Sequence, residues 1–158
     1  MKSIFDFTFS LVIVILLSPV ILLLGVIVFF DVGSPIIFIQ PRPGLNNDPF
    51  NFYKFRTMTN NKNNQGSLLE DRNRITKIGA FLRKTSLDEL PSFINVLKGE
   101  MSIIGPRPLL MEYLNLYSEK QSRRHTVKPG ITGWAQINGR NSISWEEKFN
   151  FDIWYIDN

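Results

Sequence analysis

Two adjacent acidic residues, Asp88 and Glu89, are the residues of this sequence best placed to do chemistry. A purely structural interpretation exists, because Ser86 and Glu89 have the spacing of a capping box and acids in a first helical turn are favoured by the helix dipole. The start of a helix is also where phosphates bind, and a carboxylate there can hold Mg²⁺ or attack phosphorus. The sequence predicts a helix start here and leaves both roles open.

Two basic segments could bind the phosphates on which such carboxylates would act. Gly105-Pro106-Arg107-Pro108 holds one arginine between two prolines, so its guanidinium is presented with little loss of backbone freedom. The planar fork of arginine suits a pyrophosphate, although a tight turn with a surface ion pair is the simpler interpretation. In residues 129–141, three glycines would let backbone amides approach a phosphate closely, and Arg140 could neutralise it.

The composition excludes several other kinds of site. The chain has neither a Walker motif nor a dinucleotide-binding fingerprint, so the ordinary nucleotide-binding folds are unsupported. It has no cysteine, which excludes disulfides and thiolate metal sites, and its single histidine, His125, excludes a histidine-ligated metal cluster. Because Arg123, Arg124 and Lys128 are nearby, we expect His125 on a basic surface. The net charge of +4 suits anionic lipid, nucleotide phosphates or nucleic acid without choosing among them.

An uncharged segment at residues 7–30 predicts a membrane anchor. As a straight helix it would be about 36 Å long, enough to cross a hydrocarbon core of about 30 Å, and it is too long for a cleaved signal peptide. Ser18-Pro19 lies in its middle, where the proline removes the hydrogen bond to the carbonyl of Ile15 and Ser18 could cover part of the freed backbone. Each half would measure about 18 Å, so a kinked spanning helix and a re-entrant helix–break–helix hairpin both fit.

The rest of the chain has room for one compact domain, and its patterns predict a mixed α/β fold of short strands and short helices. The apolar stripes of these helices fit core packing, and beside a membrane anchor one or two of them also fit the bilayer interface. The elements we expect, in chain order, are a strand at residues 35–39, a turn at 41–44, an extended segment at 50–56, an Asn-rich surface loop at 59–66, helices at 75–82 and 87–97, and an apolar helical stripe across 145–156.

Several short motifs, met in order along the whole chain, resemble those of the bacterial sugar transferase family, and specifically its small monotopic phosphoglycosyl transferases. Each motif is modest alone, and their order makes the resemblance specific. Family members usually continue beyond the segment that matches residues 154–158, so we expect this chain to be a shortened form. The motifs are Ser18-Pro19, Lys54-Phe55-Arg56-Thr57-Met58, Ser86-Leu87-Asp88-Glu89-Leu90-Pro91, Asn95-Val96-Leu97-Lys98-Gly99-Glu100-Met101-Ser102, Gly105-Pro106-Arg107-Pro108 and Lys128-Pro129-Gly130-Ile131-Thr132-Gly133-Trp134-Ala135-Gln136.

The resemblance implies a two-step phosphoryl transfer. Asp88 would attack the sugar-bearing phosphate of a UDP-sugar, expel UMP and pass the sugar phosphate to a polyprenyl phosphate, while Glu89 would orient Asp88 or help to deprotonate the acceptor. Mg²⁺ would bridge Asp88 and the pyrophosphate, where it would neutralise developing charge. The phosphate contacts that we expect on this basis are Arg107, Arg140 and Arg83.

The resemblance also implies a location and a substrate. Residues 1–31 would form a re-entrant membrane hairpin broken at Ser18-Pro19, and residues 32–158 a catalytic domain on the cytoplasmic face of the bacterial inner membrane. The sequence looks closest to members that act on N-acetylated sugars, including UDP-diacetamido-bacillosamine, at the start of glycoprotein glycan assembly. Undecaprenyl phosphate and membrane lipid are the expected partners. Nucleic acid is not expected, and a homo-oligomer is left open.

Two other classes of protein compete with this interpretation. A non-enzymatic membrane adaptor could bind anionic lipid or a partner through its basic face, and it would not need Asp88. A basic RNA-binding module is disfavoured, because the charge is dispersed and residues 7–30 are an uncharged anchor. The transferase interpretation predicts that Asp88→Asn abolishes UMP release while folding survives, which separates it from the adaptor.

Overall fold

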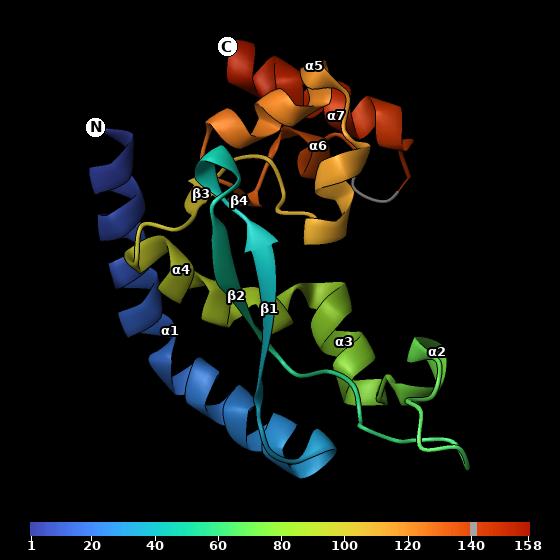
Figure 1. Ribbon diagram of the computed structural model, residues 1–158. Helices are drawn as coiled ribbons and strands as arrows, with labels where there is room; N and C mark the ends of the chain where they lie inside the picture. Colours follow the sequence, from blue (N-terminus) through green and yellow to red (C-terminus); the bar gives the residue numbers. More distant parts are fainter. Residues whose placement is uncertain (140–141) are drawn as a thin grey trace.

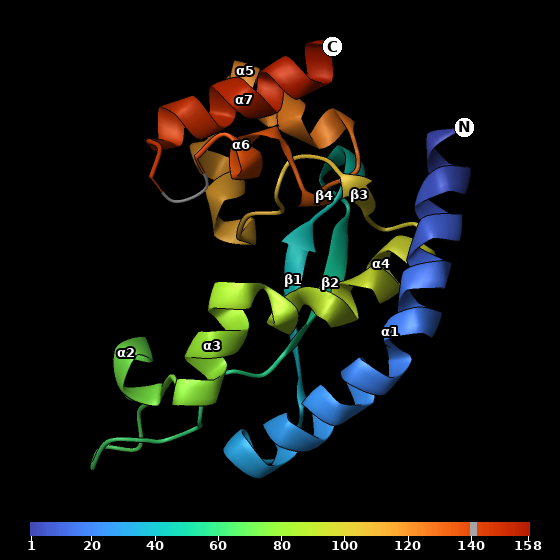
Figure 2. The same ribbon diagram turned by 180° about the vertical axis from the view of Figure 1, so that it is seen from behind.

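The computed structural model describes residues 1–139 and 142–158, and one long apolar helix, α1 (Lys2–Val32), runs along one side of it (Figure 1). By length and composition, α1 is able to cross a membrane. The helix continues through Pro19 and bends near its middle, as the two views show (Figure 2). The hydroxyl of Ser18 donates a hydrogen bond of 2.8 Å to the carbonyl of Ile15, the acceptor that Pro19 leaves without a backbone donor. The predicted kink and its local compensation are both present, within one continuous helix.

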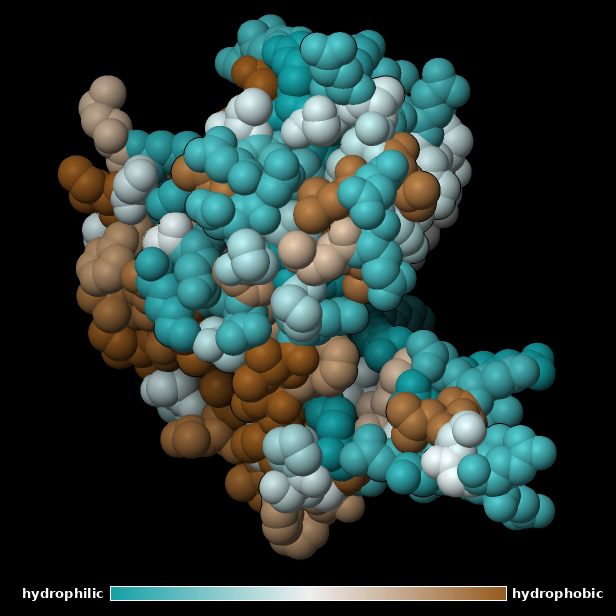
Figure 3. Space-filling model, viewed as in Figure 1, coloured by the Kyte–Doolittle hydropathy of each residue, from teal (hydrophilic) through white to brown (hydrophobic). Residues whose placement is uncertain are grey.

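Both halves of α1 pack against the rest of the chain. In the first half, the buried carboxylate of Asp6 accepts hydrogen bonds from the Ser102 hydroxyl at 2.8 Å and from the Ile103 amide at 3.2 Å. In the second half, Leu24 and Val28 are buried in a cluster with residues of the following domain. Most of the remaining surface of α1 is apolar and exposed, and Figure 3 shows this brown surface along the side of the molecule that α1 forms.

A β-hairpin follows α1. Strand β1 (Ile37–Pro43) pairs antiparallel with β2 (Pro49–Phe55), and the short 3-10 helix η1 (Leu45–Asn47) closes the turn. The extended segment predicted at residues 50–56 is confirmed. The turn predicted at residues 41–44 is wrong in its start, because β1 continues through Pro43. In this two-stranded sheet each strand has a free edge, where a proline without an amide hydrogen is tolerated.

The next helices carry the acidic pair. Helix α2 (Asp71–Arg74) leads into α3 (Lys77–Thr85), whose first turn is capped by the Thr76 hydroxyl, which accepts from the Gly79 amide at 2.8 Å. Two further short helices follow, and together they match the helix predicted at residues 87–97: the 3-10 helix η2 (Leu87–Ser92) and α4 (Phe93–Leu97).

The capping box predicted at the start of η2 is wrong. Ser86 adopts the left-handed conformation, with φ of 60°, and it ends α3. Its side chain makes no capping hydrogen bond to η2. The side chain of Glu89 is therefore free of the helix start and reaches other partners.

The C-terminal part is helical around one small parallel sheet, as Figures 1 and 2 show. In that sheet β3 (Ser102–Ile104) pairs with β4 (Gly130–Thr132). Gly130 allows a close approach, because a Cβ at this position would lie 2.1 Å from the amide nitrogen of Gly105. The mixed α/β fold class is confirmed. The surrounding helices are η3 (Met111–Leu116), α5 (Glu119–Ser122), η4 (Arg123–Thr126), α6 (Trp134–Ile137) and α7 (Trp145–Asp157).

Strand β2 contributes to two separate hydrophobic clusters, because its side chains alternate between faces. Phe55 joins Leu24, Val28 and Leu82 between α1, α3 and the hairpin. Phe50 and Phe52 point to the other face and join Val96 and Met101. Helix η2 contacts β2, so the acidic pair is held by the strand that anchors both clusters.

Candidate active site

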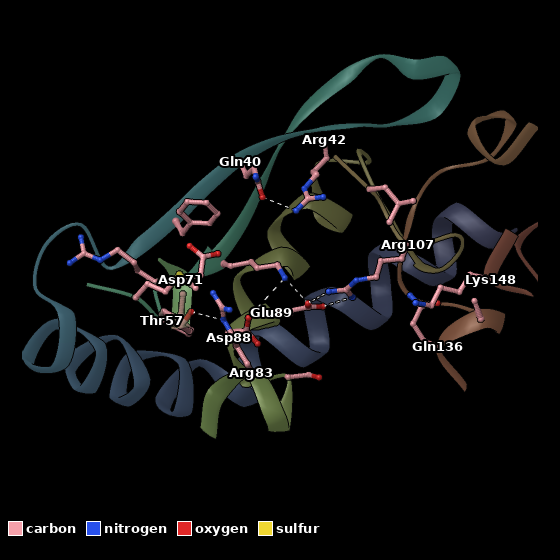
Figure 4. A pocket seen from close by; sticks show the side chains of 18 of the residues that line it. Gln40, Arg42, Thr57, Asp71, Arg83, Asp88, Glu89, Arg107, Gln136 and Lys148 are labelled. Atoms are coloured by element: carbon pink, nitrogen blue, oxygen red, sulfur yellow. Dashed lines mark hydrogen bonds and ion pairs between the residues drawn. The ribbon is translucent and has the colours of Figure 1, made fainter. Parts of the chain in front are cut away.

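A cleft of about 700 Å³ contains the acidic pair (Figure 4). Its walls come from β1, β2, α3, η2, the Gly105–Pro108 turn with its Arg107, and the helices α6 and α7. The structure brings together in this cleft four of the five residues that the sequence nominates for chemistry: Asp88, Glu89, Arg83 and Arg107. The fifth, Arg140, lies outside the described residues.

Asp88 is buried, with only 6% of its surface exposed, yet its carboxylate has few partners. Within the described part of the chain, its one ion pair is with Lys54, at 4.0 Å, and no hydrogen bond reaches its side chain. Burial raises the pKa of Asp88, and the positive charge of Lys54 opposes that rise only in part. Asp88 is thus a buried carboxylate with oxygens available to an incoming group.

Glu89, unlike Asp88, has several charged hydrogen-bond partners. Its carboxylate accepts hydrogen bonds from Lys54 at 2.7 Å and from both terminal nitrogens of Arg107, at 2.5 and 3.2 Å. Burial alone would raise the pKa of Glu89, but the hydrogen bonds and charges of Arg107 and Lys54 outweigh it and lower that pKa to about 2. Glu89 therefore stays ionised and holds two cations in place.

Lys54 is a further residue of the cleft, and the sequence analysis assigned it no role. It lies in β2, where its ammonium group is 5.0 Å from the ring centre of Phe52. Burial lowers the pKa of Lys54, while Glu89 opposes that change. A single lysine on the aromatic strand Pro49–Phe55 was the signal that could have identified it, because a buried lysine needs a carboxylate partner.

Arg83 and Arg107 reach the cleft from different elements. The Nε of Arg83 donates to the Thr57 hydroxyl at 2.9 Å, and the positive charge of Arg83 opposes the rise in the pKa of Asp88. The side chain of Arg107 is 42% exposed. Burial alone would lower the pKa of Arg107, but its hydrogen bonds and ion pair with Glu89 together outweigh burial and raise that pKa. Each guanidinium therefore keeps donors that could meet a phosphate beside Asp88.

The backbone of Arg107 is held by a buried ion pair. Arg124, in η4, donates to the carbonyl of Arg107 at 2.7 Å and pairs with Asp152 of α7 at 2.8 Å, and both partners are almost fully buried. Burial raises the pKa of Asp152 to about 6, while Arg124 opposes that rise. The sequence analysis did not find this pair, whose members lie far apart in the chain.

The prediction that His125 lies on a basic surface with Arg123, Arg124 and Lys128 is wrong for two of these residues. Arg124 and His125 are both buried. Burial, and then the charge of Arg124, lower the pKa of His125 to about 4, so this side chain is neutral at physiological pH. Helix α7 covers this part of η4, which the sequence pattern around His125 could not reveal.

The donor set at Asp88 fits a divalent cation of one particular kind. No group of three or more metal-ligating side chains occurs in the described residues, so a preformed protein cage is not present there. Mg²⁺, however, commonly uses one or two carboxylates and completes its shell with water and substrate phosphates. The carboxylate of Asp88, without hydrogen bonds among the described residues, suits such a substrate-completed site, whereas Glu89 is occupied by two cations.

A second, apolar cavity lies behind the acidic pair. It measures about 540 Å³ and is formed by α1 together with residues of the hairpin, η2 and α4. Leu90 and Pro91, which follow the acidic pair directly, line this apolar groove, and Phe55 borders both the groove and the cleft. The site therefore joins a polar cavity to an apolar one.

Comparison with known proteins gives a consistent set of relatives. A sequence model described as bacterial sugar transferase matches residues 1–158. The uncharacterized sugar transferase EpsL of Bacillus subtilis strain 168 is 57% identical over 158 residues, which are all of this chain and 78% of that protein. The UDP-glucose:undecaprenyl-phosphate glucose-1-phosphate transferase of Escherichia coli K12 is 43% identical over 161 residues, which are 96% of this chain and 35% of that protein.

A third relative comes from Salmonella typhimurium LT2. Its undecaprenyl-phosphate galactose phosphotransferase is 37% identical over 175 residues, which are all of this chain and 37% of that protein. The chain thus spans about a third of these two longer relatives and most of EpsL.

Proposed function

The chain belongs to the bacterial sugar transferase family, as its motifs predicted, and from this premise we propose that it moves a sugar 1-phosphate from a UDP-sugar to a polyprenyl phosphate and releases UMP. The observation that carries the proposal is the unequal acidic pair. Asp88 is buried and sparsely partnered at the junction of a polar cleft and an apolar groove, while Glu89 beside it holds two cations.

The names of the relatives support the substrate classes. The Escherichia coli protein is named for UDP-glucose and undecaprenyl phosphate, and the Salmonella protein for undecaprenyl phosphate and galactose. We extend to this chain the UDP-sugar donor and the undecaprenyl phosphate acceptor. An N-acetylated or diacetamido sugar, and a role in protein glycosylation, stay predictions from the sequence resemblance.

In the first step, a carboxylate oxygen of Asp88 attacks the sugar-bearing phosphorus of the donor. An Asp88–phosphorus bond forms, the phosphoanhydride bond breaks, and its electron pair leaves with UMP. A covalent intermediate divides one exchange of phosphoanhydride partners into two displacements. The sparse partners of Asp88 favour this role, because an oxygen without hydrogen bonds is a better nucleophile than one that is already engaged.

In the second step, a phosphate oxygen of the polyprenyl phosphate attacks the same phosphorus. The bond to Asp88 breaks, the carboxylate is regenerated, and a polyprenyl diphosphosugar leaves. The apolar groove of about 540 Å³ beside Leu90 and Pro91 supports a lipid acceptor, since an isoprenoid chain could lie there while its phosphate enters the cleft.

Glu89 is proposed to orient rather than to take up protons. Its pKa of about 2 makes it a weak base, and its two cationic partners fix the direction of its carboxylate. By holding Lys54 and Arg107, it keeps two donors beside the reacting phosphate, where negative charge develops. A cation such as Mg²⁺ at Asp88 would add further charge neutralisation when bound.

The attachment of α1 supports the predicted one-sided membrane insertion. Near its start, the Lys2 ammonium group donates to the Ile104 carbonyl at 3.0 Å, and near its end Asp31 accepts from the Thr76 hydroxyl at 2.5 Å. A spanning helix would place its two ends in opposite aqueous phases, whereas here both ends contact polar groups of one small domain. We propose that α1 enters and leaves by one face, which would be the cytoplasmic face. The division at residues 31 and 32 stays a prediction.

The topology can be tested directly because the chain has no cysteine. Single cysteines at exposed positions flanking the apolar run, Ser3→Cys and Ser34→Cys, would be labelled in sealed inverted vesicles and in spheroplasts with a membrane-impermeant maleimide. We expect both to react from the same side. Labelling from opposite sides would rule out one-sided insertion.

The reaction is tested by UMP release from a panel of UDP-sugars, with undecaprenyl phosphate and Mg²⁺, followed by mass spectrometry of the protein after incubation with the donor alone. We expect UMP release and a phosphosugar adduct on Asp88. A preparation that turns over without an adduct would refute the covalent step. A well-folded protein with no turnover on any UDP-sugar would favour the adaptor.

A further inference from the structure

The side-chain amide of Gln136, in α6, is unusual in having no hydrogen-bond partner among residues 1–139 and 142–158. Both its nitrogen and its oxygen are buried, and neither has a partner within the part of the chain that the structure describes. Buried amides in folded proteins are nearly always hydrogen-bonded, so an amide with two unused groups needs an explanation. Gln136 lines the cleft that contains Asp88, which makes a bound ligand the natural partner.

The backbone around Gln136 leaves room for this amide. A Cβ added at Gly133, the N-cap residue that precedes α6, would lie 2.8 Å from the Oε1 of Gln136. Any side chain at Gly133 would therefore push against the amide oxygen. The local structure keeps a free donor and a free acceptor at one position in the cleft.

Aromatic side chains line the same end of the cleft. Trp145 and Phe149 of α7 are stacked with ring centres 6.0 Å apart, and both border the cleft with Gln136. Lys148 lies between them in sequence, and its ammonium group is 4.8 Å from the Trp145 ring centre. Aromatic side chains beside a hydrogen-bonding amide offer an apolar wall that suits a planar nucleobase.

The order of side chains along the cleft matches the order of groups in a UDP-sugar. In Figure 4, Arg107 lies between the acidic pair and the side chains of Gln136 and Lys148. If Asp88 attacks the sugar-bearing phosphorus, the second phosphate and then the uridine must extend away from Asp88. Arg107 is placed to meet the diphosphate, and the nucleoside then reaches the end of the cleft at Gln136.

We propose that Gln136 binds the imide edge of the uracil, with its Nε2 donating to a uracil carbonyl and its Oε1 accepting from the N3–H. Trp145 and Phe149 provide the apolar wall of this nucleobase subsite. The proposal rests on the proposed function, because it takes the reacting phosphorus to be at Asp88. It adds a residue that recognises the nucleotide part of the donor.

The test uses the full chain in lipid nanodiscs and two nucleotides, UMP and its N3-methyl derivative, with binding measured by calorimetry. N3-methylation removes the one hydrogen that the amide oxygen accepts. A cytosine nucleotide would be a poorer probe, because an amide turned by 180° can also pair with cytosine. We expect wild-type protein to bind UMP about tenfold more tightly than N3-methyl-UMP, as for a lost hydrogen bond that leaves its partner buried.

Three variants sharpen the test. Gln136→Leu removes the amide, and we expect about tenfold weaker binding of UMP and equal affinity for the two nucleotides. Gln136→Glu keeps the shape of the side chain and should also bind UMP more weakly, since it loses the donor, which guards against a packing defect in the leucine variant. Gln65→Leu, in an exposed loop, is the matched control and should behave as wild type.

Each outcome decides the question. Loss of discrimination in Gln136→Leu, together with weaker UMP binding in both Gln136 variants and wild-type behaviour of Gln65→Leu, supports the subsite. A wild-type protein that turns over a UDP-sugar but binds both nucleotides equally overturns the subsite and leaves the proposed function intact. A protein that neither binds UMP nor turns over any UDP-sugar overturns both.

Discussion

The cleft and the apolar groove lie on either side of one short helix, and they differ in almost every physical property. On the cleft side of η2, Asp88 and Glu89 meet Lys54 and Arg107. On the groove side, Leu90 and Pro91 meet the apolar surface of α1. The six residues of η2 therefore contribute both to a charged cleft and to an apolar groove. On the proposed function, this contrast would bring a phosphate and a lipid chain to the two sides of one short helix.

The left-handed Ser86 explains how so short a helix can do this. It ends α3 and lets η2 begin in a new direction, so the acidic side chains are not used to cap their own helix. Asp88 and Glu89 line only the cleft, whereas Leu90 and Pro91 line only the groove. The cleft and groove can therefore be disturbed separately by substitutions on the two sides.

The largest effect is expected at Asp88. Asp88→Asn keeps the shape of the side chain but removes its nucleophilic charge, so we expect UMP release to fall by at least about 10³-fold. The fold should survive, because this carboxylate makes no hydrogen bond within the described residues. UMP release and circular dichroism measure the two effects. Asp48→Asn, in the exposed hairpin turn, is the control, and an active Asp88→Asn protein would contradict the mechanism.

The pH dependence of stability should report on Glu89. Its folded-state pKa of about 2 lies below the ordinary value of 4.5, so its ionised form stabilises the fold above about pH 4.5, and this contribution is lost as the pH falls towards 2. The loss is on the order of 3 kcal/mol if the whole shift is realised. We expect the melting temperature in detergent to fall less between pH 6 and pH 2 for Glu89→Gln than for wild type, as measured by thermal unfolding.

The control for this measurement is Glu70→Gln, which removes an exposed carboxylate paired with Arg72. The melting temperature of Glu70→Gln should fall with pH as it does for wild type, because surface ion pairs contribute little to stability. If the melting temperatures of wild type and Glu89→Gln fell equally between pH 6 and pH 2, the contacts with Lys54 and Arg107 would not lower the pKa of Glu89.

A smaller effect is expected at Arg107. Arg107→Ala removes a cation from the cleft, and we expect kcat/KM for the UDP-sugar to fall by about 10²-fold. Arg123→Ala is a matched control, since Arg123 is about equally exposed and pairs with Asp157 away from the cleft. An Arg107→Ala protein with unchanged donor kinetics would place the donor phosphates elsewhere.

Much of the cleft could be predicted from the sequence because its residues lie in short, ordered motifs. The acidic pair and Arg107 each stood out locally, and the Ser18 hydrogen bond followed from the known effect of Pro19 on the carbonyl of Ile15. The two strands of the hairpin and the helices near residues 75–82, 87–97 and 145–156 were also predictable from apolar spacing, within a few residues at their ends.

The rest depended on contacts between distant segments. Arg124 and Asp152 pair only because α7 packs on η4, and burial of His125 has the same cause. The free amide of Gln136 is visible only once its neighbours in space are known. The left-handed backbone at Ser86 gives no signal in the sequence, since serine is not a residue that favours it.

The smallest effect is expected in the groove, and it would show that the two cavities act separately. Ile94 of α4 lines the groove and is 45% exposed, so a bound isoprenoid chain would cover it. Ile94→Ser removes part of that apolar contact, and we expect KM for undecaprenyl phosphate to rise about fivefold. Formation of the Asp88 adduct from the donor alone should not change, because that step uses only the cleft. Ile78→Ser, at an exposed isoleucine outside the groove, is the matched control. If Ile94→Ser slowed adduct formation as much as lipid transfer, the cleft and the groove would have to be treated as one site.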